Sequence, residues 1–253
     1  MAAVEFEVKD GVAVMTLNRP EAKNALDGAI FEGLRAGYAE INRNPEIRVG
    51  VLTGAGGTFC SGMDLKAFVR GEKMDSTGVP YGGKANVVVE KPTIAAVEGY
   101  AVAGGFELAL TCDMIVAARS AKFGIPEVRR GLCASGGGLV KLPRQATLRV
   151  AMEMALTGDF YDAESLQQRG VINRVTPDGE ALKGALELAA KIAANGPLAV
   201  AASRKVILAS LEWPVSEAMD RQKEITVPVR GSNDAREGAT AFAEKRPPRW
   251  TGT

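Results

Sequence analysis

The sequence predicts an α/β fold of repeated strand, turn and helix units, followed by a helical C-terminal region. Two observations lead to this prediction. Short apolar strands, glycine-rich turns and helices alternate at intervals of roughly 40 residues. From about Leu148 the pattern changes, and amphipathic helical stretches dominate. The repetition is one of structure, because the units share no repeated sequence words.

The chain begins with a hairpin and a helix. Residues 4–8 and 12–17 alternate between apolar and polar side chains, and the Asp10-Gly11 pair between them is typical of a tight hairpin turn. From about Asp27 apolar residues recur at helical spacing, and Asn44-Pro45 ends this helix.

The middle of the chain repeats the strand, turn and helix order. A buried strand at 49–54 leads through four glycines into a short helix that begins at Asp64. Residues 71–88 mix glycine, proline, serine and charge, which predicts a mobile surface excursion. A strand that runs into glycines is expected within 93–105, and a short apolar helix and another strand follow.

The last third is mainly helical. Two helices are expected after Leu148, the second ending at Arg169-Gly170, and a strand follows at 171–175. An amphipathic helix then ends at Gly196-Pro197, and the remaining segments are helical, with a charged tail.

The change in pattern near residue 195 predicts a boundary. Residues 1–195 would form the core that holds the site, and residues 196–253 a helical region. A helical appendage packed on the same core fits the sequence equally well.

Composition excludes several classes of protein. With 46% hydrophobic and 24% charged residues, the 253-residue chain has the balance of a globular protein with an ample core. Lys and Arg total 31 against 30 for Asp and Glu, so no bulk charge favours nucleic acid or an anionic membrane as a partner. The N-terminus lacks the pattern of a signal peptide, and no stretch of about 18 apolar residues predicts a membrane span.

The three cysteines are Cys60, Cys112 and Cys133, with no CxxC pair. This usage indicates reduced thiols in a cytoplasmic protein. We interpret them as small buried residues rather than nucleophiles, because the chain has no histidine to activate them. The absence of histidine also excludes Ser-His-Asp catalysis and histidine-ligated zinc. Acid and base chemistry near neutral pH must therefore use carboxylates, Lys, Tyr or Cys.

Two glutamates are the candidate acid and base groups. Glu107 is the one charged residue in a short apolar helix opened by Gly104 and Gly105, where burial would raise its pKa towards a useful range. Glu127 lies on a turn after Gly124 and Pro126. Each has a simpler interpretation: Glu107 as a partner of the helix dipole, and Glu127 as a solvated loop carboxylate.

The glycine turns could supply backbone donors. In the segment TFCSGMDL, Gly62 precedes Met63, whose N–H is predicted to be free to bind an oxyanion, with Gly104 as a possible second donor. A plain glycine turn is the alternative. The GAGG sequence at 54–57 fits a dinucleotide-binding motif poorly, because Phe59 occupies the third glycine position.

Taken together, these segments resemble the enoyl-CoA hydratase (crotonase) superfamily over nearly the whole chain. Five stretches, in the family's order, are similar: LNRPEAKNAL (17–26), VLTGAGGTFCSGMDL (51–65), AVEGYAVAGGFELALTCD (96–113), FGIPEVRRGL (123–132) and AFAEKRPPRW (241–250). The resemblance implies a crotonase-like spiral of ββα units, with the C-terminal helical region packing trimers that often pair into hexamers. It also implies an acyl-CoA substrate, as in fatty-acid β-oxidation, with coenzyme A as part of the substrate and no metal or other cofactor.

The family's catalytic residues match positions in this chain. Met63 and Gly104 match the two backbone donors of the oxyanion hole, and Glu107 and Glu127 match the two catalytic glutamates of the hydratases. We assign the water mainly to Glu107 and the α-proton mainly to Glu127. The residues implied at the substrate are Lys23, Ala25, Met63, Asp64, Leu65, Lys66, Gly104, Phe242 and Lys245, of which the last two would reach a neighbouring subunit's CoA.

The resemblance predicts a hydro-lyase that adds water to an enoyl-CoA thioester, or removes it. One departure is CASGGG at 133–138, where typical hydratases carry Pro-Gly-Ala-Gly-Gly; this is closer to carnitinyl-CoA dehydratase-like members and leaves the acyl group open. The alternatives are another acyl-CoA enzyme on this scaffold, such as an isomerase or thioester hydrolase, or a non-catalytic scaffold that binds acyl-CoA or RNA.

Overall fold

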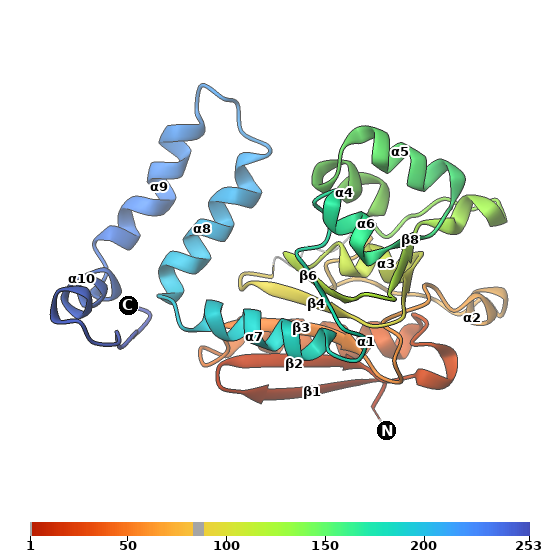
Figure 1. Ribbon diagram of the computed structural model, residues 1–253, viewed down its shortest axis with the longest axis horizontal. Coiled ribbons are helices and arrows are strands. Elements are labelled where there is room, and N and C mark those ends of the chain that lie inside the picture. The colour runs from red at the N-terminus through yellow and green to blue at the C-terminus, as the bar shows by residue number, and fades with distance from the viewer. Residues whose placement is uncertain (1, 83–88) are drawn as a thin grey trace.

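A computed structural model describes residues 2–82 and 89–253 and confirms the predicted α/β fold (Figure 1). The main sheet has the order β1-β2-β3-β4-β6-β9, and a second sheet has the order β5-β7-β8. The strands are β1 (Val4–Lys9), β2 (Val12–Leu17), β3 (Val49–Gly54), β4 (Thr93–Val97), β5 (Tyr100–Val102), β6 (Met114–Ala118), β7 (Lys122–Gly124), β8 (Tyr161–Asp162) and β9 (Arg174–Thr176).

The helices connect these strands and continue beyond them. The α-helices are α1 (Gly28–Arg43), α2 (Leu65–Val69), α3 (Gly104–Ala109), α4 (Gly138–Gln145), α5 (Leu148–Thr157), α6 (Ala163–Gln168), α7 (Ala181–Ala193), α8 (Pro197–Ser210), α9 (Ala218–Arg230) and α10 (Asn233–Glu244). Two 3-10 helices, η1 (Pro20–Ala22) and η2 (Pro126–Arg130), lie in the connections.

Strand order follows the chain through the main sheet. The predicted hairpin pairs β1 with β2 antiparallel, and the pairs β2–β3, β3–β4, β4–β6 and β6–β9 are parallel. Parallel neighbours need a crossover, and here the crossovers carry the turns, short helices and second-sheet strands that build the site. The predicted first helix is confirmed as α1, with the Asp27 carboxylate accepting a hydrogen bond from Ile30 N–H at its start.

The central strands β3 and β4 of the main sheet are apolar on both faces, because both faces are covered. Val51 and Ile94 pack with Ala185 of α7 on one face, while Met15 and Leu52 belong to the core shared with α1 and the second sheet. Strands buried on both sides read as continuous apolar runs, which explains the sequences of β3 and β4.

The single strand expected within 93–105 is wrong, because two strands occupy this stretch. β4 lies in the main sheet and β5 in the second sheet, and the chain changes sheets at Gly99, whose φ is +56°. A Cβ there would lie 2.4 Å from the Gly57 carbonyl oxygen, so only glycine fits the bend. An apolar run does not reveal such a break, because both strands are buried.

Other expectations near the site also need correction. The strand expected at 171–175 lies at Arg174–Thr176. Helix α4 was not predicted; it begins at Gly138 after further glycines and contains Pro143, which are poor helix formers, so tertiary packing decides it. Cys60 and Cys112 are buried as expected, but Cys133 is exposed in the loop before α4.

The prediction of a surface excursion at 71–88 is partly wrong. Residues 83–88 lie outside the described residues, and the expected mobility stays a prediction. Residues 71–82 form turns and bends, but Val79 is fully buried and the Tyr81 ring packs on Phe31 of α1 with centroids 5.3 Å apart. The composition predicted a solvated loop, but the side chains of Val79 and Tyr81 pack into the protein and hold this part of the chain against the core.

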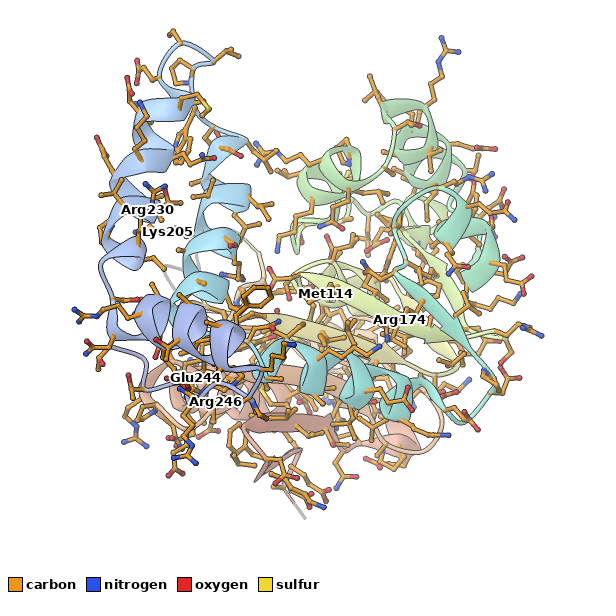
Figure 2. All side chains as sticks on the ribbon, turned by 60° about the vertical axis from the view of Figure 1, so that its left-hand side comes forward. Met114, Arg174, Lys205, Arg230, Glu244 and Arg246 are labelled. Atoms are coloured by element: carbon orange, nitrogen blue, oxygen red, sulfur yellow. The ribbon has the colours of Figure 1, made fainter. Side chains whose placement is uncertain are left out.

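The C-terminal helices leave the core beyond α7. The chain bends by 109° between α7 and α8, and α8 to α10 extend away from the sheets (Figure 1). Figure 2 shows Lys205 and Arg230 on the adjacent helices α8 and α9, with Glu244 and Arg246 at the end of α10.

Several polar contacts attach this helical region to the core. Arg204 of α8 pairs with Asp113 at 2.8 Å and donates to the Val89 carbonyl, Arg144 pairs with Glu212 at 2.9 Å, and the Trp250 indole N–H donates to the Ala194 carbonyl. Among the described residues no single helix is long and apolar enough to span a membrane, and α7 with α8 satisfies length and composition only as a sharply bent pair.

Candidate active site

Two turns from different parts of the chain bring Met63 and Gly104 together. Gly62 has φ +98°, and a Cβ added to it would lie 2.8 Å from the Ala103 Cβ, so the two turns touch through their backbones. A Cβ on Gly104 would lie 3.5 Å from the Met63 nitrogen. Within the described residues, neither the Met63 N–H nor the Gly104 N–H donates a hydrogen bond to a protein group. Two free donors thus lie side by side, as an oxyanion hole requires.

Backbone pairing fixes this approach. Cys60 bridges Ala101 of β5, and Met63 bridges Leu26, in single parallel ladder steps. A Cβ on Gly105 would lie 2.2 Å from the Cys60 carbonyl oxygen, so the start of α3 can pass this close only because residue 105 is glycine.

Glu107 projects from α3 into a pocket of glycine backbone. Its residue is 2% exposed; Oε1 accepts from the Gly138 N–H at 2.9 Å, and Oε2 accepts from the Tyr81 hydroxyl at 3.3 Å. Burial raises the pKa of the Glu107 carboxyl, while the N–H groups of Gly138 and Gly136, the Tyr81 hydroxyl and the Lys141 charge oppose the rise. Both carboxylate oxygens therefore have fixed partners.

Glu127 has the opposite environment. It lies in η2 rather than on the simple turn that we expected, and its Oε2 is buried with no hydrogen-bond partner among the described residues. Burial raises the pKa of the Glu127 carboxyl to about 7; the charge of Glu107 adds to the rise, and its own N–H and the Arg130 charge oppose it. The two carboxyls are thus close enough to interact, and the pKa of Glu127 lies near neutral pH.

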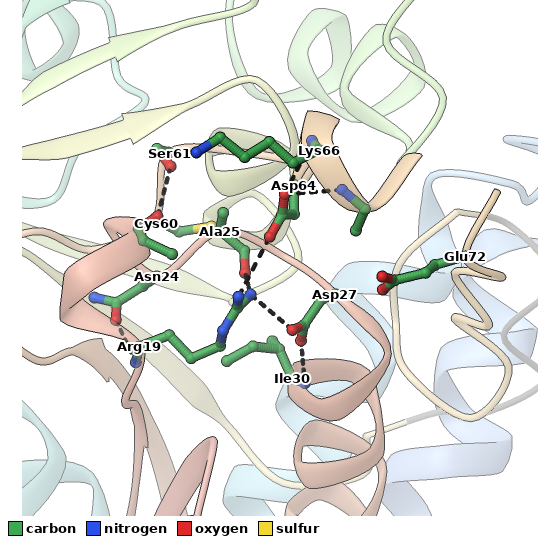
Figure 3. Close-up of polar contacts among 12 residues, drawn as sticks. Arg19, Asn24, Ala25, Asp27, Ile30, Cys60, Ser61, Asp64, Lys66 and Glu72 are labelled. Carbon is green, nitrogen blue, oxygen red and sulfur yellow. Dashed lines mark hydrogen bonds and ion pairs between the residues drawn. The ribbon is translucent and has the colours of Figure 1, made fainter. Parts of the chain in front are cut away.

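Arg19 ties the Met63 turn to the start of α1 (Figure 3). Its guanidinium pairs with Asp27 at 2.7 Å and with Asp64 at 3.3 Å, and it donates to the Ala25 carbonyl at 2.8 Å. The three charged side chains are only 14–21% exposed, so the pairs are shielded from solvent more than ordinary surface pairs. Asp64 also caps α2 by accepting from two of its N–H groups.

The residues expected to bind CoA fall into two groups. Lys23 and Ala25 lie beside the 61–66 segment, because Ser61 N–H donates to the Lys23 carbonyl and Asp64 N–H donates to the Leu26 carbonyl. Leu65 and Lys66 form the exposed start of α2. The second group, Phe242 and Lys245, lies at α10, on the opposite side of the chain from α2 (Figure 1). One chain does not bring the two groups together.

Sequence reasoning did not place Tyr81 or Lys141 at the site, although Lys141 belongs to a sparse basic group with Arg144 and Arg149. Tyr81 lies in a stretch whose glycine and charge content indicated a surface loop, and Lys141 lies in the unpredicted helix α4. No local signal places either residue beside Glu107, since 26 and 34 positions separate them from it in the chain. The described residues include no group of three or more Asp, Glu or Cys side chains arranged to hold a metal ion.

The fold and the site together define the class of this protein. Its members have an α/β spiral in which two free backbone N–H donors lie beside two interacting glutamates. The comparisons agree with this class. The family model for enoyl-CoA hydratase/isomerase matches residues 7–253. The chain is 42% identical to enoyl-CoA hydratase EchA19 of Mycobacterium tuberculosis, covering 98% of each chain, and 40% identical to carnitinyl-CoA dehydratase of Salmonella heidelberg, covering 94% of each.

A solved structure agrees as well. The crystal structure of an enoyl-CoA hydratase from Mycobacterium tuberculosis H37Rv superposes with a TM-score of 0.95 at 49% identity, and all of both chains is covered. The protein belongs to the enoyl-CoA hydratase/isomerase family, the crotonase superfamily.

The close contact at Gly62 leads to a first prediction. Gly62→Ala adds a Cβ that strains a positive φ and pushes the Met63 turn away from Ala103, so kcat should fall by roughly tenfold or more, since the two donors lose their spacing. Steady-state kinetics with an enoyl-CoA substrate measures the effect. Gly71→Ala is the matched control, because Gly71 also has a positive φ (+74°) but nothing within 4 Å of its Cβ position. Equal activity of the two variants would contradict the prediction.

Proposed function

We propose that this protein catalyses the reversible addition of water across the 2,3-double bond of an enoyl-CoA thioester. The observation that supports this most directly is the pair of interacting glutamates beside the free Met63 and Gly104 donors. The family and the relatives named enoyl-CoA hydratase support the same reaction. The coenzyme A group belongs to the substrate, and we propose no further cofactor.

The reaction needs a place for negative charge. When water attacks C3, electrons move from the double bond to the thioester oxygen, which becomes an enolate oxygen. Two preorganised N–H donors, from Met63 and Gly104, stabilise that oxygen, and each such donor typically contributes about 3 kcal/mol to the transition state. Because the donors are backbone groups, their positions depend on the turns rather than on side-chain rotamers.

The two glutamates carry the protons. Glu107, with both oxygens held, orients the water and accepts a proton as the new C–O bond forms at C3. Glu127, protonated near neutral pH, donates a proton to C2 as the enolate collapses. In the reverse direction the roles exchange: Glu127 removes the C2 proton and Glu107 protonates the leaving hydroxyl. This division stays a proposal.

Replacing either glutamate tests this function. Glu107→Gln and Glu127→Gln keep the side-chain shape but remove the proton transfer, so each should lower kcat by roughly 10²- to 10⁴-fold. Loss of the conjugated-thioester absorbance of an enoyl-CoA measures hydration. Glu187→Gln, on an exposed position of α7, is the control. Full activity of both glutamine variants would refute the proposal.

Product analysis separates the alternatives on the same scaffold. Mass spectrometry of the products distinguishes a gain of water from double-bond migration or release of free CoA. The relatives named carnitinyl-CoA dehydratase and the CASGGG loop make a dehydratase with a polar acyl group the second candidate. The substrate panel should therefore include short, medium and branched enoyl-CoAs and carnitinyl-CoA. Tight CoA binding without turnover on this panel would favour a binding scaffold.

The raised pKa of Glu127 predicts the alkaline limb of the pH profile. Hydration needs the protonated Glu127 carboxyl, so kcat/KM should fall as pH rises through about 7, the pKa of Glu127. Dehydration starts from the form with the proton on Glu107 instead, which carries the same total number of protons, so its kcat/KM should fall over the same range. Rates of both reactions on one substrate pair, measured across this range, test the assignment. A kcat/KM for hydration that stays level or rises through this pH would contradict it.

We also propose that residues 196–253 join three chains into a trimer, which can pair into a hexamer. We propose further that the protein works in the cytoplasm, in reactions such as those of fatty-acid β-oxidation. Ile207 and Leu208 of α8 and Leu211 directly after it are 45–66% exposed, and Phe242 of α10 is 88% exposed. Such exposure is unusual for apolar side chains gathered in one region. The three free cysteines fit a reducing compartment.

Assembly makes a further prediction. Analytical ultracentrifugation should give three or six times the chain mass, and Phe242→Ala should raise KM for the CoA substrate by several-fold without changing stability, because Phe242 would contact a neighbour's CoA. Val215→Ala is the control, since Val215 is 93% exposed outside the helices. A fully active monomer would contradict the proposal.

A further inference from the structure

We propose that Tyr81 is a positioning residue for the reaction: its hydroxyl holds Oε2 of Glu107 and so fixes the direction in which the carboxylate meets the attacking water. This inference rests on the proposed hydration. Neither the tyrosine nor its segment was singled out by any motif in the sequence, and the role follows from contacts in the structure.

The hydroxyl lies between the two parts of the site. It donates to Glu107 Oε2 at 3.3 Å, and a Cβ placed on Gly104 would lie 2.6 Å from the same hydroxyl oxygen. The phenol therefore lies beside the Gly104 donor of the oxyanion hole as well as beside the Glu107 carboxylate. A substrate whose carbonyl oxygen reaches Gly104 would carry its C2 and C3 past this hydroxyl.

Glu107 is fixed from both sides. Oε1 accepts from the Gly138 N–H and Oε2 from the Tyr81 hydroxyl, so both oxygens are held and their unoccupied lone pairs are the acceptor sites for water. Gly136 makes the arrangement possible, because a Cβ there would lie 2.3 Å from Tyr81 Cζ and 2.6 Å from Glu107 Oε2. Because residue 136 is glycine, the Tyr81 ring and the Glu107 carboxylate can both lie close to its Cα.

Three contacts hold the tyrosine segment in place. Gly82 N–H donates to the Gly136 carbonyl at 3.0 Å, Lys141 Nζ donates to the Pro80 carbonyl at 3.3 Å, and the Tyr81 ring packs on Phe31. Residues 80–82 are thereby docked on the same glycine loop that binds Glu107. The backbone contacts fix the position of the segment, and the phenol cannot swing away from Glu107 without losing its packing on Phe31.

The charges around Glu107 define what the phenol does. Burial and the Glu107 charge raise the pKa of the Tyr81 hydroxyl far above its usual value, so it stays protonated and donates. Among the residues that the structure describes, the charged or titratable groups that face Glu107 are Tyr81 from the 80–82 segment, Lys141 from α4 and Glu127 from η2. Tyr81 and Lys141 favour the carboxylate, whereas Glu127 when ionised disfavours it. Removing the hydroxyl therefore raises the pKa of Glu107.

Tyr81→Phe tests the proposal, because it removes one oxygen atom and keeps the ring. We expect kcat for hydration to fall roughly tenfold to hundredfold, the range for one hydrogen bond to a charged group, with KM within about twofold. The acidic limb of the pH profile should move to higher pH, because a carboxylate with a raised pKa is lost earlier as pH falls. In the Glu107→Gln background the same substitution should have no further effect on the rate.

The controls separate positioning from folding. Tyr161→Phe removes a hydroxyl on β8, outside the site, and should leave rate and pH profile unchanged. Lys141→Met removes the anchor behind Pro80 without touching the phenol, and should move the acidic limb in the same direction as Tyr81→Phe. Melting temperatures of all variants report whether the fold is kept.

The outcomes distinguish this inference from the proposed function. An unmoved acidic limb in Tyr81→Phe, or an equal loss of rate in the wild-type and Glu107→Gln backgrounds, would overturn the positioning role while hydration by the wild-type protein still stands. A wild-type protein that adds no water to any enoyl-CoA would instead overturn the proposed function, and the inference with it.

Discussion

The site depends on a backbone contact that tolerates no side chains. The turn at Gly62 and the start of α3 at Gly105 approach so closely that an added Cβ would lie 2.8 Å from the Ala103 Cβ or 2.2 Å from the Cys60 carbonyl oxygen. Glycines remove the steric limit, and the ladder step between Cys60 and Ala101 supplies the hydrogen bonds that hold the turns together. The N–H groups of Met63 and Gly104 stay free, because neither of them takes part in the hydrogen bonds between the two turns.

The same reliance on glycine continues around Glu107. Gly136 and Gly138 bring their peptide groups against the carboxylate, which keeps a charged oxygen supplied with donors inside a buried pocket. Glu127 lacks such donors at Oε2, so burial raises its pKa to about 7. Two residues of one type thus acquire different proton affinities from their surroundings, because donors surround Glu107 whereas Glu127, with one oxygen unpartnered among the described residues, is buried beside a second carboxylate. Such a difference is what acid and base catalysis by a pair of carboxyls requires.

Much of the fold was predictable where local signals act alone. Asp10-Gly11 defined the hairpin, and Asp27 began a periodic helix where the structure begins it. The break at Gly99 was not predictable, because a strand that changes sheets looks the same as one continuous buried strand. Helix α4 was missed because its glycines and Pro143 disfavour a helix in isolation, and packing outweighs that preference.

The chemistry available to this protein can be read from its amino-acid sequence: no histidine, two glutamates beside glycine turns, and motifs in the order of one family. How those groups act depends on the tertiary structure. Tyr81 and Lys141 reach Glu107 from distant segments, and the pKa of Glu127 depends on its burial and on the charge of Glu107. The physical reason is that spacing along the chain reports local conformation, whereas desolvation and hydrogen bonding depend on what tertiary packing brings within a few ångströms.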